Sequence, residues 1–480
     1  MRTMRNPILM ICLVLALSAL ACSLPLSVAT PTTGGPTVDV MATQLVPAFT
    51  AQAGLTMTAA YRATQAPTAP PRPTATATPL PATPVPTQVP TSAPGVAKDI
   101  PAKGVLRAVF TDGGHNLWVW SADSAARKVT NSGDVMEGRV ADDGLQIAYL
   151  RCPTTITCAL SSANLDGTQT KEIVSERAFT DMQHSTSADG VAPYVWGYIP
   201  GEHALAFSTQ PIDSSGGMTS PTLDLWTVNT DTGKQTNLLN AGSGGVFYYA
   251  PNGSQIAIVN ANSINLVNAD GSNRRTALTF PQVLTYAEFV YYPNVQWALD
   301  SSVLYAVVPP ADSLAKPAQS TTLWKIPTDG TAAAMLGAVV TNPLAPLKFS
   351  PDLKQIAYLA DSLDGKARNQ LHLAQVSGVG DEVYRTDVSN ILSWAPDSSR
   401  FVYSSGGLVY LGQAGQGPTQ VVDTKTALTV DWLNANQILF LYKSLGGWEL
   451  RTSSPGAAST LVAGISGDPA KFIPTYSSNY

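Results

Sequence analysis

Four histidines are the side chains of this sequence best suited to bind a transition metal, and their spacing argues against a metal site. His115, His184, His203 and His372 are widely separated, and no H-E-x-x-H zinc motif is present. No G-x-S-x-G nucleophile elbow occurs either. We therefore expect no metal, no cofactor and no catalytic centre. Convergence of His184 and His203 on one face of the fold is the alternative.

The cysteines form two groups of different character. Cys152 and Cys158 end the segment CPTTITC, and with no second pair nearby they are poorly spaced for a metal. In an exported protein such a pair favours a local disulfide, with two free buried thiols as the alternative. Cys12 and Cys22 belong to the N-terminal apolar segment.

That N-terminal segment has the features of an export signal. Two arginines precede an uncharged apolar run, which ends in LSALAC with Ala21 directly before Cys22. This ending resembles the lipobox of bacterial lipoproteins, in which the signal peptide is removed before the cysteine and the thiol is acylated. We expect residues 1–21 to be a lipoprotein-type signal peptide and Cys22 to carry the lipid. An ordinary cleaved signal and an uncleaved anchor are the alternatives.

A low-complexity tether is expected over residues 22–100. Its second half, TAPPRPTATATPLPATPVPTQVPTSAPG, consists largely of proline and threonine. Such a segment cannot bury enough apolar surface to fold. At ~3.1 Å per residue, a polyproline-like tract of about 35 residues reaches on the order of 100 Å. It would hold residues 101–480 away from the membrane.

The composition of the chain argues against two classes of partner. Hydrophobic residues make up 44% of the 480 residues, whereas only 13% are charged and the formal net charge is -5. No basic stripe is present for a polyanion, so we expect no binding of nucleic acid. After the N-terminus, no apolar run reaches the ~20 residues of a membrane-spanning helix.

A repeated unit organises residues 101–480. Its clearest copy is LKFSPDLKQIAYL, an extended run ending in an aromatic residue, then a polar S-P-D turn and an apolar strand. The turn aspartate can bond its own downstream backbone N–H, which fixes a tight reversal. Copies recur about every 40–50 residues, beginning at Gly138, Val195, Val246, Asn294, Leu347, Ile391 and Thr429.

Each copy is followed by two further strand patterns, so one unit predicts four antiparallel strands. Segments such as LWVW, LWTVN and LWKIP come third, and Asp-Gly hairpins at Asp166, Asp270 and Asp329 lead into a short fourth strand. Four-stranded sheets repeated at this period are the blades of a β-propeller. The sequence therefore predicts an all-β propeller.

The two ends of the repeat array predict how the ring closes. Residues 105–130 supply three strands that lack a first one, and KFIP from Lys471 repeats KFSP from Lys348. We therefore expect the C-terminal strand to complete the N-terminal sheet. Seven full copies and this composite make eight blades. Seven blades are the alternative if the degenerate copy near Tyr198 or Leu433 belongs elsewhere.

The S-P-D-x-x-x-I-A-Y units resemble the WD40-like repeats of TolB-type propellers, which are also found beside prolyl-oligopeptidase-type catalytic domains. The resemblance covers residues 104–474 and implies the propeller fold. It implies no single activity, because this fold carries many. Together with the lipobox it makes the chain similar to a bacterial lipoprotein that carries a TolB-like propeller.

Binding is expected on the face that carries the long loops. Strand order places both short turns of a blade on one face and both long loops on the other. The candidate ligand contacts in these loops are His184, Tyr286, Phe289, Tyr291 and Tyr292. The aromatic rings would stack on a sugar or a peptide. Packing of residues 289–292 between blades, as an extension of the inner strand, is the favoured alternative.

We expect a non-catalytic binding module for an envelope protein, a peptide or a glycan, lipid-anchored outside the cytoplasm. An extracytoplasmic carbohydrate-active enzyme, a lyase or hydrolase with a funnel active site, is the alternative. A TolB-like assembly partner in the periplasm is a third possibility. His372 takes the strand position that Trp118, Trp226 and Trp324 occupy elsewhere, so we expect it to pack rather than to bind.

Overall fold

The computed structural model describes residues 107–182, 188–212, 223–287, 289–421, 427–444, 447–454, 456–467 and 475–478. The expected signal peptide and tether, with Cys22, therefore lie outside the described residues, and so does His184. No helix in the described ranges is long and apolar enough to cross a membrane.

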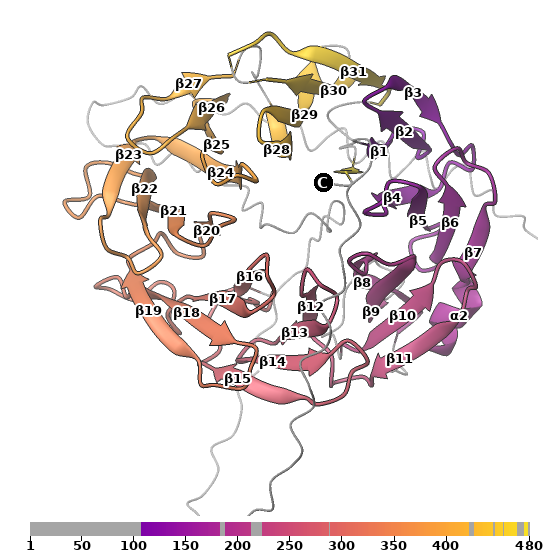
Figure 1. The fold of residues 1–480 in the computed structure, drawn as a ribbon, viewed down its shortest axis with the longest axis horizontal. Coiled ribbons are helices and arrows are strands. Elements are labelled where there is room, and N and C mark those ends of the chain that lie inside the picture. Colours follow the sequence, from indigo (N-terminus) through magenta and orange to yellow (C-terminus); the bar gives the residue numbers. More distant parts are fainter. Residues whose placement is uncertain are drawn as a thin grey trace, which may run out of the picture. The chain divides into compact units, whose positions relative to one another are not determined.

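In the described ranges the chain forms eight four-stranded antiparallel sheets, which surround a common centre (Figure 1). The prediction of an eight-bladed propeller is confirmed, and the alternative of seven blades is wrong. Blade 1 is the composite sheet β32-β1-β2-β3, and blades 2 to 8 follow in chain order from β4 to β31.

The strands fall into four sets by their position in the blade (Figure 1). The innermost strands of blades 1 to 8 are β32 (Tyr476–Ser478), β4 (Val135–Val140), β8 (Gly190–Tyr198), β12 (Val246–Tyr249), β16 (Asn294–Trp297), β20 (Lys348–Phe349), β24 (Val388–Trp394) and β28 (Ala427–Asn434). The second strands are β1 (Arg107–Thr111), β5 (Gln146–Arg151), β9 (Ala204–Ile212), β13 (Gln255–Val259), β17 (Val303–Val308), β21 (Gln355–Ala360), β25 (Phe401–Ser405) and β29 (Gln437–Ser444).

The two outer sets complete each sheet. The third strands are β2 (Leu117–Ser121), β6 (Ala159–Asn164), β10 (Leu225–Asn229), β14 (Ser263–Asn268), β18 (Thr321–Pro327), β22 (Gln370–Gln375), β26 (Leu408–Gly412) and β30 (Gly447–Ser453). The outermost strands are β3 (Ser124–Lys128), β7 (Lys171–Val174), β11 (Gln235–Leu239), β15 (Arg275–Thr279), β19 (Ala334–Val339), β23 (Glu382–Arg385), β27 (Thr419–Gln420) and β31 (Thr460–Ile465). One short helix, α2 (Glu176–Asp181), lies between blades 2 and 3.

The hydrophobic core lies between neighbouring blades. Second strands such as β21 are buried along almost their whole length, whereas outermost strands such as β3 are mostly exposed. Both faces of a blade pack against neighbours, so its middle strands read as continuous apolar runs rather than as alternating ones. One such cluster joins Val307 and Leu323 of blade 5 to Phe349 and Ile356 of blade 6.

The S-P-D turns fold as the sequence predicts. In blade 5 the backbone N–H of Ser302 donates to Oδ1 of Asp300 at 3.0 Å, and blade 7 repeats this bond between Ser399 and Asp397. The turns also link blades, because the N–H of Asp352 donates to the hydroxyl of Ser398 at 2.9 Å. This chemistry is therefore part of the scaffold.

The ring closes through β32, which pairs antiparallel with β1 and places Tyr476 opposite Phe110. The predicted completion of the N-terminal sheet by the C-terminal strand is confirmed. The described pairing covers Tyr476 to Ser478, which follow the KFIP motif in the sequence. Residues 471–474, which carry that motif, lie outside the described residues.

Candidate functional site

Each blade has two kinds of connection, and they define two faces of the ring. The turns from first to second strand and from third to fourth strand are short; in blade 6 they cover 350–354 and 376–381. The connections from second to third strand, and from one blade to the next, leave from the opposite ends of the strands. We call the side of the ring that carries the short turns the short-turn face. The opposite side is the long-loop face.

Exposed hydrophobic side chains gather on two loops of the long-loop face. One loop covers 280–293, before β16, and the other covers 309–320, between β17 and β18. The exposed side chains, which we call the apolar patch, are Leu284 (53% exposed), Tyr286 (62%), Phe289 (49%), Val290 (38%) and Leu314 (54%). Exposed apolar surface of this kind is characteristic of binding sites.

Hydrogen bonds hold the two loops together. The backbone N–H of Leu284 donates to the carbonyl of Ala311 at 2.7 Å, and the hydroxyl of Ser313 donates to the carbonyl of Leu284 at 2.9 Å. The hydroxyl of Tyr286 donates to Oδ1 of Asp312 at 2.8 Å. These bonds tie the two loops to each other, so less ordering is left to be done on binding.

Tyr286 is the most constrained member of the apolar patch. Its φ of 55° lies in the left-handed region, which bulky residues seldom adopt and which is often found at functional sites. The hydrogen bond to Asp312 raises the pKa of the Tyr286 hydroxyl, because ionisation would remove the proton that the carboxylate accepts.

The structure separates the four aromatic candidates into two pairs. Tyr286 and Phe289 are exposed, whereas Tyr291 and Tyr292 are half-buried. Tyr292 packs against the core cluster shared by blades 4 and 5, and burial raises the pKa of Tyr291. The alternative of packing between blades therefore fits Tyr291 and Tyr292 but not Phe289. The expected extension of the inner strand is wrong, because β16 begins at Asn294.

His203 and His372 make contacts with carboxylates that serve the scaffold. On the short-turn face, Nε2 of His203 lies 2.9 Å from Oδ2 of Asp143, which joins blade 3 to blade 2. His372 stacks on Tyr358 and donates from Nδ1 to Asp381 at 3.0 Å, in the strand position predicted for packing. Over the part of the chain that the structure describes, no three His, Cys, Asp or Glu residues are grouped as for a metal ion.

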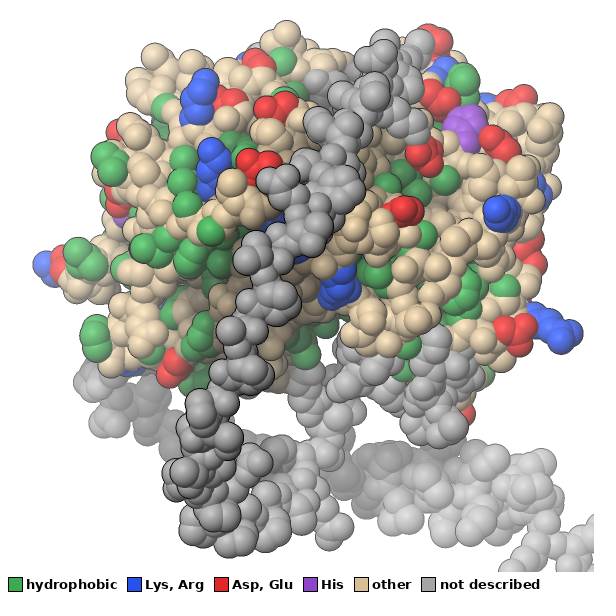
Figure 2. Space-filling view, turned by 60° about the horizontal axis from the view of Figure 1, so that its bottom comes forward, with side chains coloured by type: hydrophobic (Ala, Val, Ile, Leu, Met, Phe, Trp, Pro, Cys, Tyr) green, Lys and Arg blue, Asp and Glu red, His purple; other side chains and the backbone are tan. Residues whose placement is uncertain are grey.

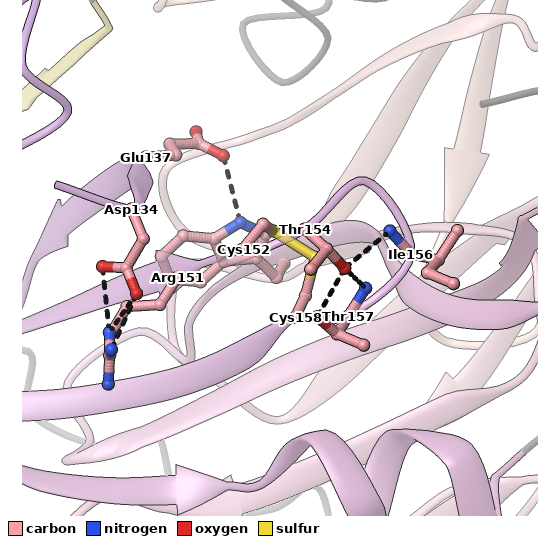
Figure 3. Close-up of a disulfide and its surroundings, with 9 residues drawn as sticks. Asp134, Glu137, Arg151, Cys152, Thr154, Ile156, Thr157 and Cys158 are labelled. Carbon is pink, nitrogen blue, oxygen red and sulfur yellow. Dashed lines mark hydrogen bonds and ion pairs between the residues drawn. A yellow bond between two sulfur atoms is a disulfide. The ribbon is translucent and has the colours of Figure 1, made fainter. Parts of the chain in front are cut away.

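Cys152 and Cys158 are joined by a disulfide with an S–S distance of 2.12 Å (Figure 3). The bond spans the long loop between β5 and β6. Inside this loop the hydroxyls of Thr154 and Thr157 lie 2.7 Å apart, and Thr157 forms an isolated bridge with Val191 of β8. The disulfide thus closes a loop of blade 2, and the bridge from Thr157 joins this loop to the inner strand of blade 3.

Charged residues on the innermost strands were not among the site residues predicted from the sequence. On β4, Arg139 forms an ion pair with Glu137 and lies over the ring of Trp196, 5.5 Å from its centroid. The Trp196 indole N–H donates to Oε2 of Glu137 at 3.0 Å. Burial raises the pKa of Glu137, although Arg139 and Trp196 both favour its charged form.

A second charged group joins blades 6, 8 and 1. Burial raises the pKa of Asp431 on β28, opposed by a hydrogen bond from Tyr476 of β32 and by the positive charge of Lys348. Burial also lowers the pKa of Lys348 on β20. Carboxyl groups whose pKa values are raised by burial are candidates for function.

Arg139, Lys348 and Asp431 share one position of the repeat. The position directly before the recurring aromatic residue is Arg139, Gly197, Tyr248, Gln296, Lys348, Ser393 and Asp431 in blades 2 to 8. Side chains here reach the next blade at the inner edge of the ring: Gln296 donates to the carbonyl of Ser350 and Ser393 to that of Val430. The variation of residue type at this position is the feature of the sequence from which these residues could have been predicted.

Comparisons with known proteins show the fold alone. No family model and no curated protein matches the sequence. Among solved structures, an oligogalacturonate lyase in complex with manganese has 14% identity and a TM-score of 0.41, covering 63% of this chain and 81% of its own. TolB from Acinetobacter baumannii has 15% identity and a TM-score of 0.32, with coverage of 58% and 63%.

A peptidase shows a similar degree of structural likeness to this chain. Dipeptidyl peptidase 4 from Porphyromonas gingivalis has 11% identity and a TM-score of 0.47, with coverage of 75% of this chain and 59% of its own. A likeness at this level to a lyase, a peptidase and TolB alike carries no argument about activity.

Proposed function

We propose that the protein is a non-catalytic binding module, lipid-anchored through Cys22 outside the cytoplasm, that binds a protein or peptide through the apolar patch. The observation that carries this proposal is the exposure of five large hydrophobic side chains on loops that hydrogen bonds hold in place. Exposed apolar surface is costly in water, and its cost is recovered when a partner covers it.

The chemistry of the apolar patch favours a protein or peptide over a glycan. Three of its members, Leu284, Val290 and Leu314, are aliphatic, and aliphatic side chains offer no flat face for a sugar ring. The nearby carboxylate of Asp312 already accepts bonds at Oδ1 from Tyr286 and from the backbone of Leu314. A glycan would find few free polar groups here.

The path of the described chain places its first residues and the apolar patch on opposite faces of the ring. Residue Ala108 near the start of β1 pairs with Ser478 at the end of β32, which is the end of the innermost strand at the short-turn face. The described chain therefore enters the ring on the short-turn face, while the apolar patch lies on the long-loop face.

The test is capture of partners from an envelope fraction by the full-length protein and by matched variants. Leu284→Ser combined with Leu314→Ser removes apolar area without touching the core. Leu363→Ser is the control, because Leu363 is fully exposed (102%) on another long loop. We expect the double variant to lose the partner by about tenfold or more, and the control to retain it. Equal capture by all three proteins would refute the proposal, and binding to a glycan array alone would replace it.

A second candidate function is a carbohydrate-active enzyme, a lyase or hydrolase working in the centre of the ring. It is favoured by Glu137 and Asp431, two carboxyl groups whose pKa values burial raises. The test is release of reducing or unsaturated ends from a panel of polysaccharides. Activity that disappears in Glu137→Gln or Asp431→Asn would establish this function in place of the first.

A further inference from the structure

Four tyrosines gather at the inner edge of blades 3, 4 and 5. Tyr194 belongs to β8, Tyr248 belongs to β12, and Tyr291 and Tyr292 lie just before β16. These three innermost strands follow one another around the centre of the ring (Figure 1). Tyr194, Tyr248 and Tyr292 pack against the same core cluster, which blades 4 and 5 share. We call the four residues the tyrosine cluster.

A break in strand register helps to place Tyr194 in the tyrosine cluster. β8 pairs with β9 on both sides of Tyr194, at Pro193 and at Val195, but not through Tyr194 itself. One extra residue of this kind is a β-bulge, which redirects a side chain and is often found next to functional sites. The regular alternation of β8 alone therefore does not set the direction of the Tyr194 side chain.

The hydroxyl groups of the tyrosine cluster are unused and reach solvent. None of the four forms a hydrogen bond with the described residues, whereas the hydroxyl of Tyr358, for example, donates to Asp381. All four tyrosines are half-buried, and none of their hydroxyls is among the fully buried atoms that lack a partner. Each hydroxyl can therefore donate a hydrogen bond to a ligand.

The tyrosine cluster is uncharged at neutral pH. Burial raises the pKa of Tyr194 to about 12, and the nearby hydroxyls of Tyr292 and Tyr248 add to this shift. Burial also raises the pKa of Tyr248 to about 12, and it raises the pKa of Tyr291, to which the Tyr248 hydroxyl contributes. No Asp, Glu, Lys or Arg side chain is among the causes of the shifts in the four tyrosines. The result is a group of neighbouring, neutral O–H donors.

A pocket next to Tyr248 offers space for a ligand. Its volume is about 460 Å³, and Tyr248 lines it together with Val195, Gly197 and Gln296. Gly197 takes the repeat position of Tyr248, and a Cβ placed on it would meet nothing within 4 Å. Blade 3 therefore leaves open the position that a tyrosine fills in blade 4, and a side chain the size of proline fits this volume.

We propose that the tyrosine cluster binds the chain's own proline-rich segment, residues 79–90, with the sequence PLPATPVPTQVP. Proline has no backbone N–H, so such a segment offers ring faces and carbonyl acceptors but few donors. The tyrosine cluster offers the complement, aromatic rings and unused O–H donors. Grooves lined by aromatic residues are a recurrent means of binding polyproline helices.

Charge favours the same occupant. Residues 73–97 contain seven prolines and no charged side chain, so their burial against a neutral surface removes no charge from water. An anionic ligand would need a cation to offset its desolvation, and no Lys or Arg contributes to the pKa shifts of the tyrosine cluster. On the face shown in Figure 2, basic side chains are scattered rather than gathered into a patch.

The proline-rich segment can reach the tyrosine cluster of its own chain. About 16 residues lie between Pro90 and Arg107, the first described residue. At ~3.3 Å per residue they extend on the order of 50 Å, more than the roughly 15 Å width of a four-stranded blade several times over. A segment attached in this way has an effective concentration on the order of 1 mM. Even a weak site is therefore filled by the chain's own segment.

The first experiment titrates a fluorescein-labelled peptide of residues 79–90 into two full-length proteins, the wild type and a tether variant. The tether variant carries Pro81→Ser, Pro84→Ser and Pro86→Ser, which free the tyrosine cluster. We expect the peptide to bind the tether variant at least about tenfold more tightly than the wild type, in which the chain's own segment competes. A peptide with the same three substitutions is the control and should not bind. No binding to the tether variant, or equal binding to both proteins, would overturn the proposal.

Hydroxyl-deletion variants of the tether variant locate the site. Tyr194→Phe combined with Tyr248→Phe keeps both rings and removes two unused hydroxyls. We expect the affinity for the peptide to fall about tenfold, without a lower melting temperature, because the hydroxyls have no partner in the ring itself. Tyr410→Phe is the matched control, because Tyr410 is a half-buried tyrosine of blade 7 whose hydroxyl also forms no hydrogen bond with the described residues. Equal affinities in the two variants would overturn the proposal.

Sedimentation separates docking within one chain from docking between two copies. Docking within one chain predicts that the mass of the wild type does not change with concentration. A dimer that grows with concentration and disappears in the tether variant would overturn the proposal in favour of a second copy. Leu284→Ser with Leu314→Ser, in the tether variant, should bind the peptide normally, so this result and that for the protein partner are independent.

Discussion

The hydroxyl oxygens of Thr111 and Thr475 lie 3.1 Å apart, although 364 positions separate the two residues in the chain. The backbone joins them as well: the N–H of Thr111 donates to the carbonyl of Thr475 at 3.0 Å, and the N–H of Thr475 donates to the Thr111 hydroxyl at 3.1 Å. With the short pairing of β32 and β1, these bonds close the ring without a covalent link.

Deletion of residues 468–480 should therefore unfold the whole ring. Blade 1 would lose its innermost strand, and the inner edge of β1, with Phe110 now buried, would face water. Calorimetry and circular dichroism should show a melting temperature many degrees lower, or no cooperative transition. Deletion of residues 479–480 alone is the control and should have no effect. A truncated protein that melts like the wild type would show that β32 does not hold the ring closed.

The disulfide should contribute less than the closing strand. Cys152 and Cys158 enclose a short loop, with a sequence separation of 6, for which the chain-entropy model gives about 2 kcal/mol. Reduction should lower the melting temperature by only a few degrees. The double variant Cys152→Ser, Cys158→Ser should melt like the reduced protein and should not respond to reductant. Identical melting of the oxidised and reduced wild type would contradict this prediction.

Much of the fold follows from local chemistry, which is why the sequence predicts it. The turn aspartates, such as Asp300, and the Asp-Gly hairpins act within a few residues, and they recur at the period of a blade. The register of the closing strand could not be predicted in this way. This strand pairs Tyr476 with Phe110, which lie at opposite ends of the repeat array, and no local motif encodes such a register.

The charged groups at the centre of the ring depend on closure in the same way. Lys348 and Asp431 belong to blades 6 and 8, and only the ring brings the positive charge of one within reach of the other. Gly197 is a further example, since its missing side chain becomes a pocket only when three innermost strands meet. The exposure of Tyr286 and Phe289 could likewise not be predicted without the loop geometry, because an aromatic residue in a sequence can either pack in the core or bind a ligand.

Asp431 predicts a pH dependence of stability with a definite sign. Burial raises its pKa above 3.8 in the folded protein, so ionisation opposes folding. Its contribution to stability is most favourable below pH 3.8 and decreases as the pH rises toward the folded pKa. Asp431→Asn stays neutral, so its melting temperature relative to wild type should increase from acidic to neutral pH.

Asp300→Asn is the matched comparison, because the shift at Asp300 has the opposite sign. Hydrogen bonds from the backbone and side chain of Ser302 lower the pKa of Asp300 below 3.8, so its charged form favours folding. The melting temperature of Asp300→Asn relative to wild type should decrease from acidic to neutral pH. Parallel trends in the two variants, measured by thermal melts across this range, would contradict the assignment whose predicted sign is not observed.

Replacement of Cys22 by serine should release the protein from membranes. Serine has no thiol to be acylated, so metabolic labelling with a fatty acid should disappear and the protein should move to the soluble fraction. Cys12→Ser is the control, because Cys12 lies inside the expected signal peptide, and labelling should persist. Labelled Cys22→Ser protein would show that the anchor is elsewhere.

The hydrogen bond from Tyr286 to Asp312 should determine how rigid the apolar patch is. Tyr286→Phe keeps the exposed ring but removes the 2.8 Å bond that ties one loop to the other. We expect faster hydrogen exchange at the amide of Leu284, whose bond to Ala311 depends on the same pair of loops, because the loops open more often. The amide of Ser302, held in its turn by Asp300, is the internal control and its exchange should be unchanged.

The affinity for the partner should fall in Tyr286→Phe, since a more flexible patch must be ordered on binding. Unchanged exchange at Leu284 would show that the remaining bonds are sufficient to hold the patch.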